Sequence, residues 1–313
     1  MSTPPRSSGC RSGGPRTPRC SSVTRPSPDG SRQLGVLGSP IAHSRSPLLH
    51  RTAYAALGLT WEYDAYDVPA DALDAFVAGL GPEWRGLSLT MPLKETVIPL
   101  LDSMDAVARA TGAVNTVLVT FSEEGRRLDG FNTDVFGIRE ALRRAGVESS
   151  MHAVVIGGGA TARSAVAAVA QLGAEHVDIV LRSPEKAGDV VETARASGLS
   201  TSVVALHDRS AVAALEPDLT ISTLPGGVGA GETVEGLALT RSSALLDVAY
   251  HPWPSELATV WEASGGEAVP GLAMLAHQAI AQIRIFTGGD PLLPLPNEEA
   301  LTASLLKALA LPA

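Results

Sequence analysis

Two serines lie between two prolines near the start of the chain, in the segment "GSPIAHSRSP" at residues 38–47. Ser44 and Ser46 are two residues apart, so their hydroxyls face the same way if the segment is extended. A hydroxyl pair of this kind can bind an anionic group. Alternatively, Ser46 caps a helix whose first position is Pro47. The segment by itself leaves both interpretations open.

A lysine and an aspartate lie further along the chain, each at a boundary between predicted elements. Lys94 follows Thr90 in "LTMPLKE", after a predicted strand, and Asp134 of "GFNTDVFG" directly precedes a predicted helix. Asn115 of "GAVNT" and Gln278 of "LAHQA" add two amides. A lysine and an aspartate can exchange a proton during hydride transfer while hydroxyls and amides orient a polyhydroxylated acid. The structural alternatives are a solvated lysine and a helix cap at Thr133 or Asp134.

A glycine-rich segment, "IGGGATA" at residues 156–162, supplies a second kind of chemistry. Gly157, Gly159 and Ala162 fit the pattern G-x-G-x-x-A, between a valine-rich strand and a long helix of small residues. In this setting the glycines let the backbone approach a pyrophosphate, and the helix N-terminus attracts its negative charge. The segment therefore predicts a dinucleotide-binding loop.

The end of the following strand indicates which dinucleotide is bound. A site for NAD would place an acid there to bond the ribose 2′-hydroxyl. Here the strand "HVDIV" runs into "LRSPEK", with Arg182 and Lys186, while Glu185 lies further along the loop. Two cations suit a 2′-phosphate, so the sequence favours NADP(H) over NAD.

These residues are positioned by an alternation of short apolar strands and helical segments, which predicts an α/β fold with parallel-rich sheets. We expect a disordered leader, an N-terminal substrate-binding domain, a Rossmann-type NADP-binding domain, and C-terminal helices that pack back on the substrate domain. The expected boundaries are residues 1–31, 32–132, 133–270 and 271–313.

The charge distribution bounds the possible partners. The net charge is −9, yet residues 1–32 contain six arginines and one acid, so the remainder is strongly acidic. Because the chain after residue 32 is acidic, we do not expect it to bind nucleic acid or an anionic membrane. No apolar run approaches the ~20 residues of a membrane span. The ligand is therefore expected to be a small molecule held by a local cluster of donors.

The positions of the cysteines and the composition of the leader bear on the type of site and on the location of the protein. Both cysteines, Cys10 and Cys20, lie in the leader, which excludes a disulfide framework, a thiolate metal site or a cysteine nucleophile from the body. This usage fits a cytoplasmic protein. The leader is acid-poor and rich in Ser and Arg, as transit peptides are, but its six prolines argue against the amphipathic helix such peptides need. A dispensable leader is the preferred interpretation.

The ordered set of motifs resembles the shikimate dehydrogenase family. The matching segments span about residues 33–290 and are "SPIAHSRSP", "LSLTMPLKE", "GAVNT", "GFNTDVFG", "GGGATARSA", "DVAYHPWPSEL" and "GLAMLAHQA". The resemblance implies reversible NADPH-dependent reduction of 3-dehydroshikimate to shikimate, in aromatic amino-acid biosynthesis. It also implies two α/β domains with the active site in the cleft between them, and no metal.

The resemblance assigns roles to individual residues. Lys94 and Asp134 would be the catalytic pair, with Lys94 as the proton donor in the reduction direction. Ser44 and Ser46 would bind the substrate carboxylate, with Tyr250 nearby. The ring hydroxyls would be held by Thr90, Asn115 and Gln278, and the cofactor by Gly157, Gly158, Gly159, Ala160, Thr161, Ala162, Arg182, Lys186 and Gly271. His43 and Arg45, inside the serine segment, receive no role.

The sequence departs from the family pattern at Ser88, where an asparagine is common, and at Leu181, where an asparagine commonly precedes the arginine. The alternatives are a quinate/shikimate or aminoshikimate-type dehydrogenase, or a non-catalytic shikimate-sensing regulator on the same fold. Arg182 argues against an NAD-preferring quinate enzyme, and the presence of both Lys94 and Asp134 argues against a regulator. The sequence leaves a monomer and a homodimer equally open.

Overall fold

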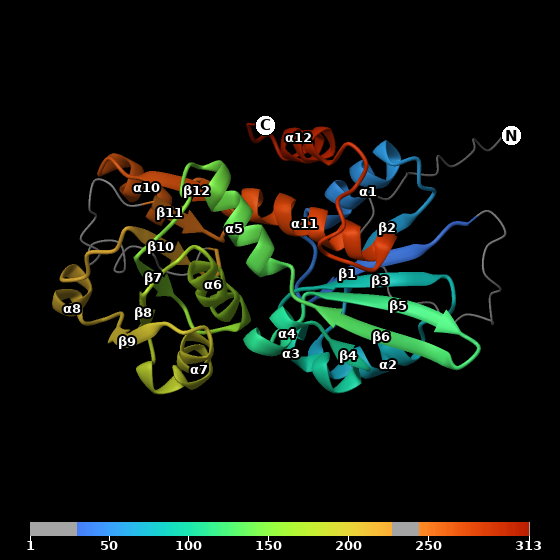
Figure 1. The fold of residues 1–313 in the computed structure, drawn as a ribbon, viewed down its shortest axis with the longest axis horizontal. Coiled ribbons are helices and arrows are strands. Elements are labelled where there is room, and N and C mark those ends of the chain that lie inside the picture. The colour runs from blue at the N-terminus through green and yellow to red at the C-terminus, as the bar shows by residue number, and fades with distance from the viewer. Residues whose placement is uncertain (1–29, 227–243, 313) are drawn as a thin grey trace, which may run out of the picture.

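The chain forms two six-stranded sheets joined through two helices (Figure 1), as seen in a computed structural model that describes residues 30–226 and 244–312. The predicted leader, with both cysteines, lies outside the described residues except for its last two positions. No helix in the described ranges has the length and apolar character needed to cross a bilayer.

The first sheet contains the N-terminal strands in the order β2-β1-β3-β5-β6-β4. The strands are β1 (Gln33–Gly38), β2 (Glu62–Asp67), β3 (Trp84–Leu89), β4 (Ser103–Met104), β5 (Thr116–Ser122) and β6 (Gly125–Phe131). β1 pairs in parallel with both β2 and β3, whereas β5 is antiparallel to β3 and to β6. The β5–β6 hairpin is a departure from our expectation, because no strand was predicted over residues 125–131.

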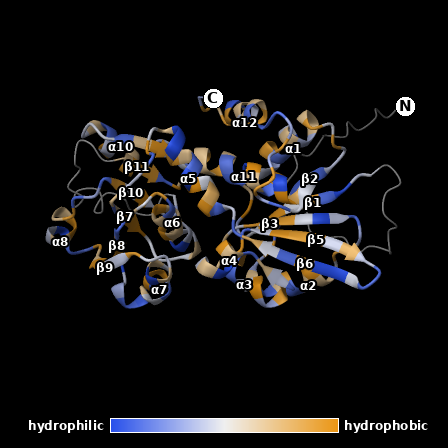
Figure 2. Cartoon of the chain, viewed as in Figure 1, coloured by the Kyte–Doolittle hydropathy of each residue, from blue (hydrophilic) through white to orange (hydrophobic). Residues whose placement is uncertain are grey.

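Apolar side chains cover both faces of this sheet. On one face, Leu34 and Val36 of β1 share a core with α1 (Ser46–Ala56), α11 (Gly271–Gly288) and α12 (Glu298–Ala308). The other face carries Leu37 and Leu87 under α2 (Leu73–Ala78), α3 (Leu93–Thr96) and α4 (Ala106–Thr111). The two faces alternate along β1 as the period of a strand requires. The hydropathy colouring in Figure 2 contrasts apolar β5 with largely polar β6.

The second sheet is parallel throughout, with the strand order β12-β11-β10-β7-β8-β9. Its strands are β7 (His152–Ile156), β8 (His176–Leu181), β9 (Ser200–Ala205), β10 (Leu219–Ser222), β11 (Ala244–Asp247) and β12 (Glu267–Pro270). Read from β9, this is the 3-2-1-4-5-6 order of a Rossmann fold. The helices are α6 (Ala160–Gln171), α7 (Gly188–Ala196), α8 (Arg209–Ala213) and α10 (Glu256–Ala263).

Two helices connect the sheets. The chain passes from β6 through α5 (Asp134–Arg144) to β7, and returns from β12 through α11. α5 and α11 pack closely against each other, and Gly137 makes this possible because a Cβ there would lie 2.7 Å from the Met274 carbonyl oxygen. The predicted α/β class with a Rossmann-type unit is confirmed.

Candidate active site

The strand directions of the first sheet bring its polar segments to one edge. β1 and β3 run parallel and end at this edge, so the serine segment and Thr90 follow them there. β5 runs the opposite way and begins there, so Asn115 lies beside Leu89, whose N–H donates to the Asn115 carbonyl at 2.7 Å. β6 is antiparallel to β5 and ends there, directly before residues 132–134. The hairpin that sequence patterning missed therefore places the asparagine and the aspartate together.

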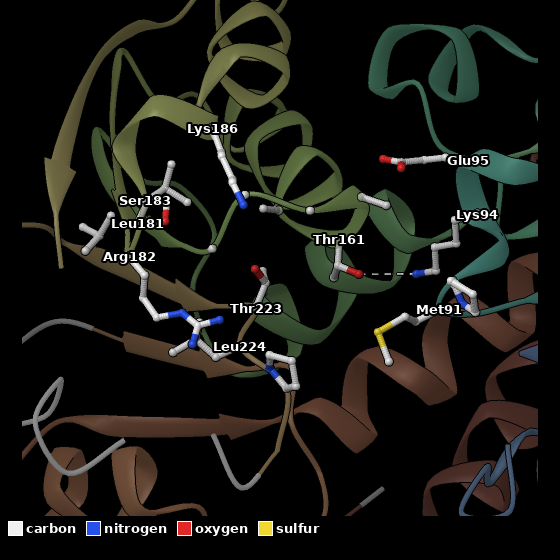
Figure 3. A pocket seen from close by; sticks show the side chains of 18 of the residues that line it. Met91, Lys94, Glu95, Thr161, Leu181, Arg182, Ser183, Lys186, Thr223 and Leu224 are labelled. Carbon is white, nitrogen blue, oxygen red and sulfur yellow. Dashed lines mark hydrogen bonds between the residues drawn. The ribbon is translucent and has the colours of Figure 1, made fainter. Parts of the chain in front are cut away.

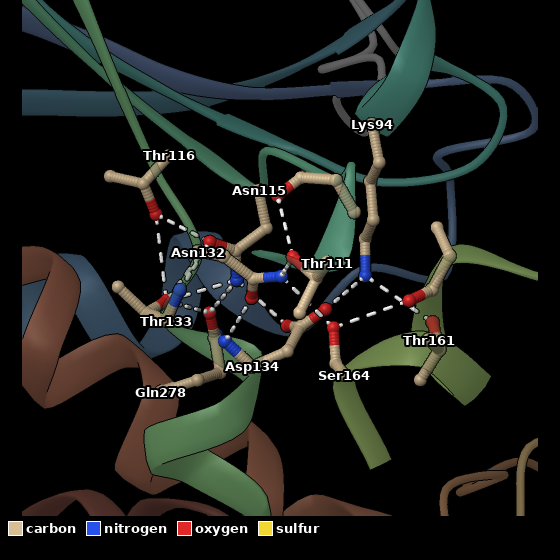
Figure 4. A network of polar contacts seen from close by, with 12 residues as sticks. Lys94, Thr111, Asn115, Thr116, Asn132, Thr133, Asp134, Thr161, Ser164 and Gln278 are labelled. Atoms are coloured by element: carbon tan, nitrogen blue, oxygen red, sulfur yellow. Dashed lines mark hydrogen bonds and ion pairs between the residues drawn. The ribbon is translucent and has the colours of Figure 1, made fainter. Parts of the chain in front are cut away.

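Lys94 and Asp134 form an ion pair at this edge. Lys94 Nζ lies 2.5 Å from Asp134 Oδ2, and the two side chains are only 14% and 6% exposed. The same ammonium lies 3.4 Å from Oγ1 of Thr161, in the first turn of α6 (Figure 4). The pair thus joins the first sheet to the glycine-rich loop of the second, and its enclosure strengthens the attraction between the two charges.

An amide network surrounds the aspartate. Asn115 Nδ2 lies 2.7 Å from Asp134 Oδ1, 2.9 Å from Thr133 Oγ1 and 3.2 Å from Gln278 Oε1. Asn115 Oδ1 accepts from the Thr133 N–H at 2.8 Å, so the orientation of this amide is fixed. Thr133 makes no side-chain cap, and the Asp134 N–H is instead bonded by Asn132 Oδ1 at 3.0 Å. Thr133 thus occupies the N-cap position of α5 without capping the helix through its side chain, and Asp134 is the first residue of the helix.

A cavity of about 280 Å³ opens beside this pair. It brings together every residue that we assigned to catalysis or substrate binding: Ser44, Ser46, Thr90, Lys94, Asn115, Asp134, Tyr250 and Gln278. The cap interpretation of Ser46 is also wrong, because Arg45 is the N-cap of α1 and Ser46 is its first residue. Both serines line the cavity, and Ser44 Oγ accepts from the Ser46 N–H at 3.3 Å.

Tyr250 and His43 also line this cavity. Burial raises the pKa of Tyr250, while the charge of Arg45 acts in the opposite direction. The ring of His43 stacks on that of His251 with centroids 5.6 Å apart. The structure thus brings the serine segment and the loop after β11 into contact through His43, a residue to which we assigned no role from the sequence.

A larger cavity of about 600 Å³ follows the glycine-rich loop (Figure 3). All the predicted cofactor residues from Gly157 to Ala162 line it, together with Arg182 and Lys186. Gly157 has φ +121°, and a Cβ there would lie 2.2 Å from Thr223 Oγ1, so only glycine allows the chain to turn at the end of β7. Gly271 is placed elsewhere: it lines the smaller cavity, where a Cβ would lie 2.2 Å from the Val248 carbonyl oxygen.

The larger cavity has the features that a dinucleotide phosphate needs. The N-terminus of the 12-residue helix α6 lines this cavity. Gly159 is the N-cap of that helix, and the space where a Cβ would lie is open. The two cations lie beyond the end of β8, where a ribose 2′-phosphate would extend. The two cavities share Thr90, Lys94 and Thr161, so ligands in each would meet at the lysine.

Comparison with known proteins assigns the chain to a family. A model described as the shikimate dehydrogenase substrate binding domain matches residues 36–117. A protein named shikimate dehydrogenase (NADP(+)) from Rubrobacter xylanophilus is 38% identical over 270 residues, covering 84% of this chain and 93% of that protein. The chain belongs to the shikimate dehydrogenase family. The resemblance drawn from the motifs is therefore confirmed.

Solved structures of shikimate dehydrogenases share the fold. The enzyme of Mycobacterium tuberculosis is 39% identical with a TM-score of 0.75, covering 88% of this chain and 99% of its own. Shikimate 5-dehydrogenase of Thermus thermophilus, solved in complex with NADP(H) and shikimate, is 33% identical with a TM-score of 0.72 and covers the same shares, 88% and 99%.

Sequence reasoning missed two polar residues of the smaller cavity, Ser88 and Gln282. Ser88, at the position where an asparagine is common in shikimate dehydrogenases, donates to Gln282 Oε1 at 2.9 Å and accepts from the Tyr63 hydroxyl at 2.6 Å. Gln282 Nε2 donates to Thr116 Oγ1 at 2.9 Å. Gln282 lies one helical turn after Gln278, and that spacing on an otherwise apolar helix was the signal available in the sequence.

Proposed function

We propose that this protein is an NADP-dependent shikimate dehydrogenase that interconverts 3-dehydroshikimate and shikimate. The observation that carries the proposal is the junction of the two cavities at Lys94, whose ammonium lies 2.5 Å from Asp134 Oδ2. The relatives named for this activity with NADP support it. The reaction belongs to the shikimate pathway of aromatic amino-acid biosynthesis.

The cofactor residues fit NADP(H) by charge and by space. Arg182 and Lys186 supply two cations to a 2′-phosphate, and the backbone around Gly157 leaves room for the pyrophosphate at the N-terminus of α6. When bound, NADPH supplies the hydride for the reduction. The protein's own task is then to hold the substrate and to provide a proton at the reacting oxygen.

Lys94 is the proton donor in the reduction direction. Its ammonium donates to the C3 carbonyl oxygen of the substrate and neutralises the negative charge that develops there. Asp134 keeps the lysine charged and positioned, and its carboxylate accepts a hydrogen bond from a substrate hydroxyl. Asn115, at 2.7 Å from Asp134 Oδ1, fixes that carboxylate. In the oxidation direction the same lysine accepts the proton.

The remaining lining residues orient the substrate. Ser44 and Ser46 bind the carboxylate at one end of the cavity, with Tyr250 beside it. Thr90, Asn115 and Gln278 hold the ring hydroxyls, and Asn115 and Gln278 are themselves fixed by Thr133. Hydroxyls and amides that are already bonded to one another can exchange those bonds for the substrate without large rearrangement.

A four-way assay tests the proposal. Purified protein should oxidise shikimate with NADP far faster than quinate with NAD, with the two mixed combinations in between. Arg182 and Lys186 in the cofactor cavity are the reason to expect the NADP preference. A higher kcat/KM for quinate with NAD would identify a quinate dehydrogenase instead. Tight shikimate binding without turnover in any combination would identify the sensing regulator.

We further propose the division of the chain into residues 32–132, 133–270 and 271–313, a cytoplasmic location, and a monomer or homodimer as the functional unit. The division rests on the separate cores of the two sheets and on the packing of α12 against α1. Limited proteolysis and light scattering of the purified protein test the division and the oligomeric state.

A further inference from the structure

A second polar cluster lies at the far end of the Rossmann-type sheet from the cofactor loop. His152 begins β7 and pairs in register with His176, which begins β8. Asp178 follows two residues later on β8, and so points to the same face. The distal part of that face is apolar through Val154 and Val180, whereas its starting edge carries the polar residues.

The short helix α8 packs on the apolar part of this face. α8 spans only Arg209–Ala213, and Val212 is its one buried residue, which packs with Val154 and Val180. The side chains of His152 and His176 are 31% and 36% exposed, while that of Asp178 is 5% exposed. A buried carboxylate with partly exposed histidines beside it is an arrangement that a small ligand could reach from solvent.

Three ligand atoms converge in this cluster. His152 Nε2 lies 2.6 Å from Asp178 Oδ2, and His176 Nε2 lies 3.1 Å from Asp178 Oδ1. All three side chains offer a ligand atom within 4.8 Å of the others. Two imidazole nitrogens therefore face the two oxygens of one carboxylate.

The other ring nitrogen of His176, Nδ1, has a hydrogen-bond partner of its own. His176 Nδ1 is 2.9 Å from Ser200 Oγ, and that hydroxyl is 2.8 Å from the Glu175 carbonyl oxygen. A carbonyl cannot donate, so the single hydroxyl proton points to Glu175, and Ser200 must accept from Nδ1–H of His176. Because Nδ1–H of His176 is bonded to Ser200, Nε2 is the ring nitrogen that faces Asp178 Oδ1. The same carboxylate oxygen also accepts from the Ser202 hydroxyl.

We propose that His152, His176 and Asp178 bind a divalent transition-metal ion of the zinc type. Two imidazole nitrogens and a carboxylate oxygen are a donor set that Zn²⁺ accepts in tetrahedral geometry, with water at the fourth position. Ser200 has the place of the outer partner that fixes the tautomer and the ring orientation of a metal-binding histidine. The site is independent of the dehydrogenase activity proposed above.

The ion would be structural. β7 has five residues, so at ~3.3 Å per residue the cluster lies roughly 15 Å from Gly157 along the strand. The metal would join β7 to β8, and through Ser200 to β9. We therefore expect metal binding to raise the thermal stability of the folded protein without changing kcat for shikimate.

Cobalt binding tests the proposal, because Co²⁺ substitutes for Zn²⁺ and absorbs visible light when tetrahedral. The full chain carrying Cys10→Ser and Cys20→Ser, which removes competing thiols, is treated with a chelator and titrated with Co²⁺. One equivalent should bind, and His176→Gln and Asp178→Asn should weaken binding by about tenfold or more. The matched control is His207→Gln, which alters an exposed histidine of the same sheet unit and should bind as the parent does.

A parent that binds no Co²⁺, or His176→Gln and Asp178→Asn variants that bind it as well as the parent, would overturn the proposal and leave a proton-bridged ion pair. Circular dichroism of each variant checks that it is folded. A measurement that needs no variant is the anomalous difference map of a zinc-soaked crystal of the natural chain. A peak among His152, His176 and Asp178 supports the site, whereas zinc bound only elsewhere contradicts it.

Discussion

At the scale of single residues, the decisive feature is the number of donors on Lys94. An ammonium has three protons, and Asp134 and Thr161 account for two of them at 2.5 and 3.4 Å. The third is available to a substrate oxygen in the shared part of the two cavities. Thr161, on the helix that follows the cofactor loop, thereby positions the ammonium of Lys94, which lies on α3. A proton donor is thus fixed where the two ligands would meet.

Replacing Lys94 separates catalysis from binding. Lys94→Ala should lower kcat by about 10²–10⁴-fold, the range of a lost acid–base group, while shikimate affinity changes little because the serines and amides remain. Steady-state rates and calorimetric titration with shikimate provide the two measurements. Lys307→Ala, at an exposed position on α12, is the matched control and should behave as the natural protein. Activity near the natural level in Lys94→Ala would refute the proton-transfer role.

Replacing Arg182 tests how the cofactor is distinguished. Arg182→Ala should lower kcat/KM for NADP by about tenfold or more, because a hydrogen bond to a charged group contributes roughly 1.5–3 kcal/mol, and it should leave NAD nearly unaffected. The ratio of the two specificity constants is the quantity to measure. Arg195→Ala removes an exposed arginine from α7 and should leave the ratio unchanged. Equal losses with both cofactors would mean that Arg182 does not contact the 2′-phosphate.

At the scale of secondary-structure elements, a buried histidine joins α1 to α11. His50 is fully buried, its ring stacks on Tyr63 with centroids 3.9 Å apart, and its Nε2 lies 3.1 Å from Gln282 Oε1. Burial lowers the pKa of His50 from 6.5 to about 3, although the hydrogen bond to Gln282 acts to raise it. The histidine therefore stays neutral in the folded protein above about pH 3. It is connected to the substrate cavity through its hydrogen bond to Gln282, which lines that cavity.

This histidine should make the fold sensitive to acid. The unfolded chain binds a proton at His50 below pH 6.5 and the folded chain does not until about pH 3, so stability falls as the pH falls through that window. Between pH 7 and about pH 4.5 the loss from this one group is roughly 2–3 kcal/mol. His50→Gln should remove that part of the pH dependence, as measured by urea unfolding at both pH values.

The pH control for this experiment is His207→Gln, an exposed replacement that should keep the full dependence. Burial also lowers the pKa of His277, to about 4, and its contribution is the same in all three proteins. A His50→Gln variant with the same acid-induced loss as the natural protein would show that His50 does not carry the effect.

At the scale of the whole molecule, the first sheet begins at Gln33, whose N–H donates to the Glu83 carbonyl at 2.8 Å. Removing residues 1–31 should leave the sheet and the active site in place. We expect a change in Tm below roughly 3 °C, equivalent to less than about 1 kcal/mol, and unchanged kcat with shikimate and NADP. Thermal unfolding and kinetics of the shortened chain check this, and a loss of activity would give the leader a role in the enzyme.

Local patterns in the sequence were enough to predict much of the molecule. The strand of residues 33–38, the glycine-rich turn and the long helix of residues 271–288 follow from apolar periodicity and from residue types that act on their own neighbours. The residues assigned to catalysis and substrate binding through the family motifs all line the smaller cavity, and Gly271, which we assigned to the cofactor, lines it too.

The missed features depend on contacts between distant segments. β6 reads "GRRLDGF", in which charges interrupt the alternation, and its strand conformation comes from pairing with β5. Gln282 and Ser88 are 194 residues apart, so no local pattern indicates their hydrogen bond. Ser46 and Pro47 carry a cap signature, yet the helix already includes Ser46 and its N-cap is Arg45.

The β5–β6 hairpin also provides a place for a spectroscopic probe. Ser122 pairs with Gly125 at its tip, and the two residues between them are exposed. Ser122 lies seven residues after Asn115, which places the tip roughly 20 Å from the active site. Because both cysteines precede residue 32, Glu124→Cys in the shortened chain would be the sole thiol. A fluorophore attached there would move with the first sheet and leave the substrate cavity untouched. Paired with an acceptor on a bound nucleotide, it would report the distance between the tip of the hairpin and the cofactor during turnover.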